Sequence, residues 1–86
     1  MDRPLYFIED RVKLLKDIRN DGTFPGAEKG EILIAEGEEG EVINLGTFLL
    51  DKWIYSVIFK SGKIVGCLGT ELELIERGRY YEPPSY

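Results

Sequence analysis

Alternating polar and apolar positions predict that the ordered part of the chain begins with a half-buried β-strand. In residues 11–14, charged side chains alternate with Val12 and Leu14, so the two apolar side chains share one face of an extended strand. Residues 52–60 combine aromatic and β-branched side chains, which predicts a central strand with both faces partly covered. Further short apolar segments predict strands at residues 31–35, 41–49, 63–68 and 71–76.

Glycine, proline and asparagine residues mark the first long connection. Residues 19–26 read Arg-Asn-Asp-Gly-Thr-Phe-Pro-Gly, which predicts a long, structured loop rather than a helix. In this loop we expect Asn20 and Asp21 to satisfy turn amides, and Gly22 and Gly26 to adopt positive φ. The same loop can present side chains to a partner, because loops on a rigid scaffold commonly carry binding residues.

Shorter connections complete the pattern. Residues 37–40 contain two glycines and predict a polar turn. Ser61 and Gly62 separate two strand-like segments and predict a tight hairpin. Residues 71–76 fit either a short helical turn or a strand, and the alternation of leucine with glutamate favours a last short strand.

Chain length and strand spacing together predict the fold class. The 86 residues suffice for one hydrophobic core. About five short strands predict an all-β fold, a small SH3-like barrel with a long first loop and an extended C-terminal tail, because closure removes the exposed edges of a small sheet. The expected boundaries are an N-terminal lead-in at residues 1–9, the barrel domain at 10–76 and a flexible tail containing proline and tyrosine at 77–86.

The charge balance narrows the classes of partner. The chain carries 16 acidic and 11 basic residues, a net charge of −5 that repels phosphate backbones and anionic membrane surfaces. We therefore expect neither a nucleic acid nor a membrane as a partner. The apolar run at residues 5–8 is too short for a signal peptide or a membrane span, and a cytoplasmic location is expected.

The side-chain inventory argues against catalysis and against a resident metal. Histidine is absent and Cys67 is the single cysteine, so the chain lacks the ligands of an ordinary zinc site or of an iron–sulfur cluster. Histidine-dependent catalytic arrangements are also missing. We expect no enzyme activity, no cofactor and a buried structural role for Cys67. The glutamates of residues 36–41 lack the spacing of a calcium loop and are expected to form a solvated turn.

Three stretches carry a family pattern: residues 19–26, Gly-Thr-Phe-Leu at 46–49 followed by Ile54 and Tyr55, and Val-Gly-Cys at 65–67. In order and spacing they resemble the NifZ family of nitrogen-fixation accessory proteins. The resemblance implies a role in maturing the molybdenum-iron protein of nitrogenase, where NifZ-like proteins assist formation of P-clusters from paired four-iron clusters. The implied partner is the nitrogenase molybdenum-iron protein precursor.

Exposed polar and aromatic residues are the candidate contacts with that partner. They are Arg19, Asp21 and Phe24 in the first loop, and Tyr80 and Tyr81 in the tail. A small structural SH3-like subunit of an electron-transfer complex is the alternative function, because a fold by itself does not separate the two roles.

Trp53 and Tyr55 share one face of the strand predicted at residues 52–60. They fit either an exposed aromatic anchor for a partner or packing in the core. Packing in the core is the favoured interpretation.

Overall fold

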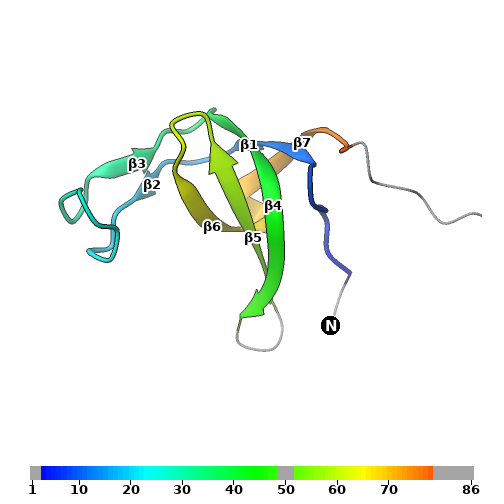
Figure 1. Ribbon diagram of the computed structural model, residues 1–86, viewed down its shortest axis with the longest axis horizontal. Helices are drawn as coiled ribbons and strands as arrows, with labels where there is room; N and C mark the ends of the chain where they lie inside the picture. The colour runs from blue at the N-terminus through cyan, green and yellow to red at the C-terminus, as the bar shows by residue number, and fades with distance from the viewer. Residues whose placement is uncertain (1–2, 49–51, 79–86) are drawn as a thin grey trace, which may run out of the picture.

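The chain folds as an all-β protein, as its strand pattern predicts. The computed structural model describes residues 3–48 and 52–78. Within these ranges the regular elements are short strands and one 3₁₀ turn, η1 (Figure 1). In chain order they are β1 (Arg11–Leu14), β2 (Ile18–Arg19), β3 (Ile32–Ile34), β4 (Glu39–Phe48), β5 (Lys52–Phe59), β6 (Ile64–Leu68), η1 (Gly69–Glu71) and β7 (Leu72–Glu76).

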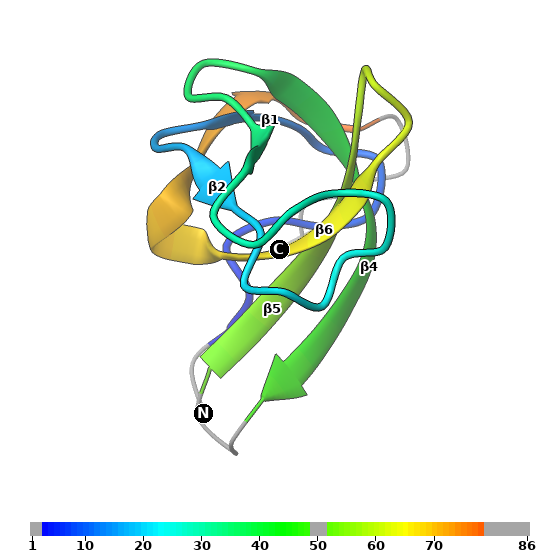
Figure 2. The same cartoon turned by 90° about the vertical axis from the view of Figure 1, so that its left-hand side faces the viewer.

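The strands form one main antiparallel sheet and a small ribbon. The main sheet has five strands in the order β6-β5-β4-β1-β7, and β2 pairs with β3 in a separate two-stranded ribbon. The strand predicted to be central, β5, is an interior strand paired with both β4 and β6. The sheet curls strongly (Figure 2), yet within the described ranges no ladder of hydrogen bonds joins its edge strands β6 and β7.

One hydrophobic core lies inside the curled sheet. Val12 and Leu14, the two residues that alternation assigns to the core, are fully buried. Burying one large aliphatic side chain contributes about 1.5–3 kcal/mol, so this cluster is the main source of stability. Its buried members come from the N-terminal segment and from strands β1, β3, β4, β5, β6 and β7: Tyr6, Val12, Leu14, Ile34, Val42, Tyr55, Val57, Phe59, Cys67 and Leu72.

A glycine assigned to a turn by the sequence pattern lies inside a strand instead. The predicted turn covers residues 37–40, but β4 begins inside that segment, and the positive φ of 89° belongs to Gly37. Gly40 pairs with β5, where an added Cβ would lie 2.6 Å from the carbonyl oxygen of Ile58. Gly40 therefore permits a close approach of two backbones, and its assignment to a turn is wrong.

The predicted hairpin between β5 and β6 is confirmed, but residues 60–63 separate the two strands, where the sequence pattern predicts Ser61 and Gly62 alone. The Phe59 amide donates to the Lys63 carbonyl oxygen at 2.9 Å, and the Gly62 amide donates to the Phe59 carbonyl oxygen at 2.8 Å. Gly62 has a φ of 87°, the left-handed conformation that closes a loop of this type. Residues 71–76 fit either a helical turn or a strand by their sequence, and the structure contains both: η1 ends at Glu71, and the predicted last strand, β7, follows.

The segment before β1 packs against the sheet. The Tyr6 ring is buried and meets the Tyr55 ring edge-on, with ring centroids 4.9 Å apart. The Tyr6 hydroxyl donates to the Leu72 carbonyl oxygen at 2.9 Å, and the Leu5 amide donates to the Tyr55 hydroxyl at 2.8 Å. Burial and the neighbouring Tyr55 raise the pKa of Tyr6. Two tyrosines therefore anchor the N-terminal segment.

The described part of the chain ends at Gly78, so most of the tail predicted at residues 77–86 lies outside the described residues. Nowhere in residues 3–48 and 52–78 does the chain form a helix with the length and apolar character needed to cross a membrane.

Candidate functional site

The loop between β2 and β3 is built around one buried asparagine, Asn20, which is 3% exposed. Its Oδ1 accepts the amide hydrogens of Gly22 and Phe24, each at 3.0 Å. Its Nδ2 donates across the loop to the carbonyl oxygens of Ala27 at 3.0 Å and Glu28 at 3.2 Å. One side chain therefore closes the loop from within, which confirms the prediction that Asn20 satisfies turn amides.

Two predicted contact residues also hydrogen-bond within this loop. The Arg19 guanidinium donates to the Gly30 carbonyl oxygen at 2.9 Å. The Asp21 carboxylate accepts from the Thr23 amide at 3.0 Å and from the Thr23 hydroxyl at 2.6 Å. The hydrogen bonds from Thr23 lower the pKa of the Asp21 carboxyl group. Both side chains are nevertheless exposed, so they hold the loop and remain accessible to a partner.

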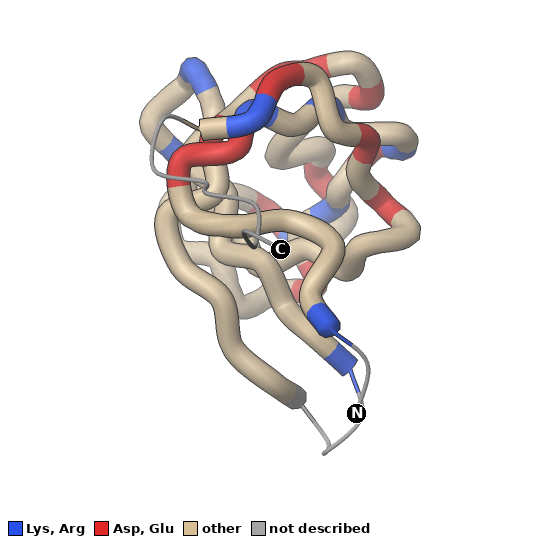
Figure 3. The backbone as a smooth tube through the Cα atoms, turned by 90° about the vertical axis from the view of Figure 1, so that its right-hand side faces the viewer, with Lys and Arg blue, Asp and Glu red and all other residues tan. Residues whose placement is uncertain are grey.

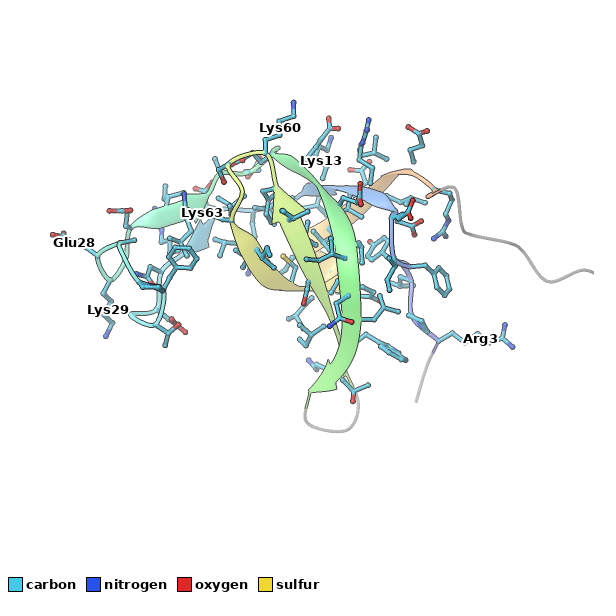
Figure 4. All side chains as sticks on the ribbon, in the orientation of Figure 1. Arg3, Lys13, Glu28, Lys29, Lys60 and Lys63 are labelled. Atoms are coloured by element: carbon cyan, nitrogen blue, oxygen red, sulfur yellow. The ribbon has the colours of Figure 1, made fainter. Side chains whose placement is uncertain are left out.

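The loop projects from the sheet. It carries Asp21 and Phe24 and extends to the left of Figure 4, where Lys29 is labelled. Arg19, which the sequence pattern assigns to the loop, is the last residue of β2 and lies at the base of the loop. Phe24 is half-buried and lies outside the core cluster. Its position and the positive φ values of Gly22 and Gly26, 103° and 85°, agree with a structured loop. Two further predicted contacts lie outside the described residues: Tyr80 and Tyr81.

A groove between the N-terminal segment and the start of β5 is a second candidate surface, and sequence reasoning missed it. Its volume is about 310 Å³. Tyr55 at its base belongs to the core, as predicted, whereas half-buried Trp53 both packs against the core cluster and lines the groove. Leu5 and Leu68 extend the apolar lining, and the exposed side chains of Arg3 and Lys52 complete it.

The two cations of β1 lie beside acidic residues on both neighbouring strands. Arg11 and Lys13 point away from the core, and their carboxylate partners on β7 lie 4.0 and 3.9 Å away. Such exposed pairs contribute about 0–1 kcal/mol each. The cross-strand neighbours of the two cations are Glu39, Glu41, Glu73 and Glu76. Figure 3 shows this mixture of acidic and basic positions, and further basic positions beside the N-terminus.

Cys67 lies in the core and does not present a reactive thiolate. It is 1% exposed, and burial, aided by the charge of Glu71, raises the pKa of the thiol to about 12. The prediction of a buried structural cysteine is confirmed. Within the described ranges, no three Asp, Glu, His or Cys side chains come together as a potential metal site.

Comparison with known proteins gives the family of this domain. A family model described as the NifZ domain matches residues 3–74. The chain belongs to the NifZ family. The match contains the loop around Asn20 and the described residues that line the groove. The resemblance carried by residues 19–26, 46–49 and 65–67 is therefore confirmed.

Several NifZ proteins are similar to this chain. Protein NifZ of Frankia alni is 44% identical over 73 residues, which cover 83% of this chain and 38% of the relative. Protein NifZ of Azotobacter vinelandii is 42% identical over 72 residues, covering 83% and 45%. Probable NifZ protein of Rhodobacter capsulatus is 41% identical over 64 residues, covering 73% and 82%. The chain thus spans less than half the length of the first two relatives. No solved structure matches it.

A buried carboxylate joins the segment before β1 to the residues that follow β7. Asp10 is fully buried and accepts hydrogen bonds from the Arg77 guanidinium at 2.7 Å and from the amides of Phe7 and Gly78 at 2.8 Å. The Arg77 guanidinium also lies 5.8 Å from the centre of the Phe7 ring. Sequence reasoning missed this cluster because a carboxylate beside a strand carries no signal until its distant partner is known.

Proposed function

We propose that the chain is a nitrogen-fixation accessory protein of NifZ type that docks on the nitrogenase molybdenum-iron protein precursor and assists P-cluster maturation. The match of the NifZ domain to residues 3–74 is the observation that carries this proposal. The role is that of a non-enzymatic binding protein working in the cytoplasm. A single cysteine, buried in the core with its pKa raised to about 12, supports docking over delivery of cluster iron by this chain's own thiolate.

The same proposal includes the architecture of an SH3-like barrel. A strongly curled antiparallel sheet of five strands, a single core and a long loop between short strands support it. An architecture of this kind gives a rigid support from which loops reach a partner.

Docking assists maturation only if the two states of the partner bind with different affinity. The chain must bind the immature conformer more tightly than the mature one, because a ligand with equal affinity for both states shifts neither population. Arg19, Asp21 and Phe24 are the proposed loop contacts, with Tyr80 and Tyr81 as further contacts. Support for the loop comes from its projection from the sheet and from the internal hydrogen bonds that pre-organise it.

A pull-down with the tagged chain tests this function. The bait is incubated with an extract of nitrogen-fixing cells blocked at P-cluster maturation, and in parallel with an extract containing mature molybdenum-iron protein. Enrichment of the precursor alone is the expected result. Recovery of neither form, together with steady recovery of a different redox complex at fixed stoichiometry, would support the small structural subunit instead.

A loop variant separates specific docking from adhesion to the resin. The double exchange Arg19→Glu and Asp21→Lys leaves the net charge unchanged and inverts the charge pattern of the loop. We expect this variant to recover less precursor. The control exchange Lys60→Glu, on the hairpin between β5 and β6, is expected to recover as much as the unaltered chain. Equal recovery by all three proteins would remove the loop from the docking surface.

A further inference from the structure

The groove beside Trp53 is built from three parts of the chain, the N-terminal segment, the start of β5 and residues 68–70, and hydrogen bonds hold its walls together. Leu5 in the N-terminal segment and Tyr55 in β5 form facing parts of its lining, and the Leu5 amide donates to the Tyr55 hydroxyl at 2.8 Å. Tyr6, the next residue, is fixed by its hydroxyl on the Leu72 carbonyl oxygen. The groove is therefore present before any partner arrives, and binding does not have to order its walls.

A glycine at the base of the groove maintains this packing. An added Cβ at Gly69 would lie 3.1 Å from Cδ1 of Leu5 and 3.5 Å from Cε2 of Tyr55. The absence of a side chain at Gly69 lets the N-terminal segment lie close to the sheet. Leu5 is nevertheless 58% exposed, so a large apolar side chain stands at the open side of the groove.

The described residues that line this groove carry a charge opposite to that of the whole chain. The protein has a net charge of −5, whereas the charged residues among the described lining residues are the cations Arg3 and Lys52. Figure 4 places Arg3 at the end of the molecule away from Lys60 and Lys63. An apolar floor beside two exposed cations is complementary to an apolar side chain flanked by carboxylates.

We propose that this groove binds an extended segment of the protein partner in which a leucine or aromatic side chain is flanked by aspartate or glutamate. The identity of that partner, the molybdenum-iron protein precursor, rests on the proposed function; the chemistry of the segment rests on the groove. A volume of about 310 Å³ lies at the lower end of the range for ligand pockets, which suits one or two side chains of a peptide. The apolar side chain occupies the floor beside Trp53, and the carboxylates pair with Arg3 and Lys52.

The first test compares two double variants of equal net charge. Arg3→Glu with Lys52→Glu alters the groove, and Lys60→Glu with Lys63→Glu alters the hairpin at the other end of β5. Each exchange lowers the net charge by 2, so both variants change it from −5 to −9. We expect the groove variant to bind the purified precursor about tenfold more weakly than the unaltered chain, and the hairpin variant to change affinity by less than about threefold. Circular dichroism checks that both variants fold.

The second test does not depend on the precursor. Trp53 is the single tryptophan of the chain, so its fluorescence reports on the groove. The probes are the peptides acetyl-Glu-Glu-Leu-Phe-Glu-Glu-amide and acetyl-Lys-Lys-Leu-Phe-Lys-Lys-amide. We expect a saturable change of Trp53 emission with the acidic peptide at concentrations about tenfold below those needed with the basic peptide. Because the net charge of the chain favours the basic peptide, that ordering requires local recognition at the groove.

The outcomes of the two tests distinguish failure of the groove proposal from failure of the proposed docking function. If the groove variant and the hairpin variant bind the precursor equally weakly, or if neither binds it more weakly than the unaltered chain, the groove proposal is overturned and the docking function stands. Failure of the unaltered chain to bind the precursor, with the acidic peptide still preferred, would overturn the docking function and support the groove. Preference for the basic peptide would overturn the groove. A dimer in sedimentation that the groove variant abolishes and the hairpin variant retains would assign the groove to a second copy of this chain and overturn the proposal.

Discussion

Replacing Asn20 with alanine is expected to destabilise the domain far more than a loop substitution normally does. The side chain of Asn20 is buried and accepts two amide hydrogens, from Gly22 and Phe24. It also donates to carbonyl oxygens of Ala27 and Glu28 on the opposite side of the loop. Alanine removes all of these interactions at once and leaves the backbone groups of the loop without partners.

The magnitude follows from the hydrogen bonds that are lost. A net contribution of about 0.5–1.5 kcal/mol per bond applies to well-formed hydrogen bonds, and part of the loss is recovered when water reaches the freed backbone groups. The expected decrease in the free energy of unfolding is therefore about 2–3 kcal/mol. For a domain of this size that decrease lowers Tm by about 10–20 °C.

Urea unfolding followed by Trp53 fluorescence and by circular dichroism measures this effect. The matched control is Asn44→Ala, since Asn44 is exposed and its Oδ1 accepts from the amide of its neighbour Leu45. We expect the control to change the free energy of unfolding by less than about 0.5 kcal/mol. A loss below about 1 kcal/mol for Asn20→Ala would refute the argument, because it would mean that water satisfies the loop as well as the asparagine does.

Three further predictions concern the strands and the core. Gly40→Ala is expected to cost about 1–3 kcal/mol of unfolding free energy because its Cβ would meet the backbone of β5, whereas Gly46→Ala, with open space around it, leaves stability unchanged or slightly raised. Asp10→Ala is expected to cost about 3 kcal/mol because it removes the buried carboxylate that accepts from the Arg77 guanidinium and from two amides. At about pH 8, alkylation of Cys67 is expected to be at least about a thousandfold slower than that of an ordinary thiol, since its pKa is raised from 9.0 to about 12.

Each of these predictions has a direct check. Chemical denaturation measures both glycine variants side by side, and equal stabilities would contradict the close approach at Gly40. For the buried carboxylate, Asp10→Asn keeps acceptor capacity and should lose less stability than Asp10→Ala; the reverse order would contradict the hydrogen-bond argument. For Cys67, rapid modification in buffer at the rate seen in concentrated guanidinium chloride would show that the thiol is accessible.

Strands and turns that are determined by neighbouring residues could be predicted from the sequence. Alternation at Val12 and Leu14, the aromatic and β-branched segment of β5, and the glycine of the hairpin were sufficient, because a two-residue period and a turn residue act over a few positions. The loop of residues 19–26 was predictable for the same reason, since Asn20 and Asp21 bond to backbone within the loop itself.

Features that depend on distant residues were not predictable from one sequence. Glycine is common in turns, so the local sequence assigns Gly40 to a turn, whereas its pairing with β5 places it in a strand. Tyr6 is buried by contacts with Tyr55 and with the backbone beside Leu72, far along the chain. The groove likewise exists only because residues 3–5 and the start of β5 meet in space. The two-residue strand β2 is too short to give a period, and it is defined by its pairing with β3.

If the chain docks as proposed, contacts at both the loop and the groove give a physical basis for distinguishing two conformations of the partner. A single contact patch senses one segment of a partner and responds weakly to where the other segments lie. Two pre-organised patches on one domain respond to relative position, because the partner must present both complementary segments at a fixed spacing to gain from both. A rearrangement that moves one segment leaves only one contact, and the affinity falls accordingly. Combining the loop exchange of Arg19 and Asp21 with the groove exchange of Arg3 and Lys52 should therefore abolish preference for the precursor, whereas each exchange by itself reduces it. Retention of the full preference in the combined variant would show that neither patch reads the conformation of the partner.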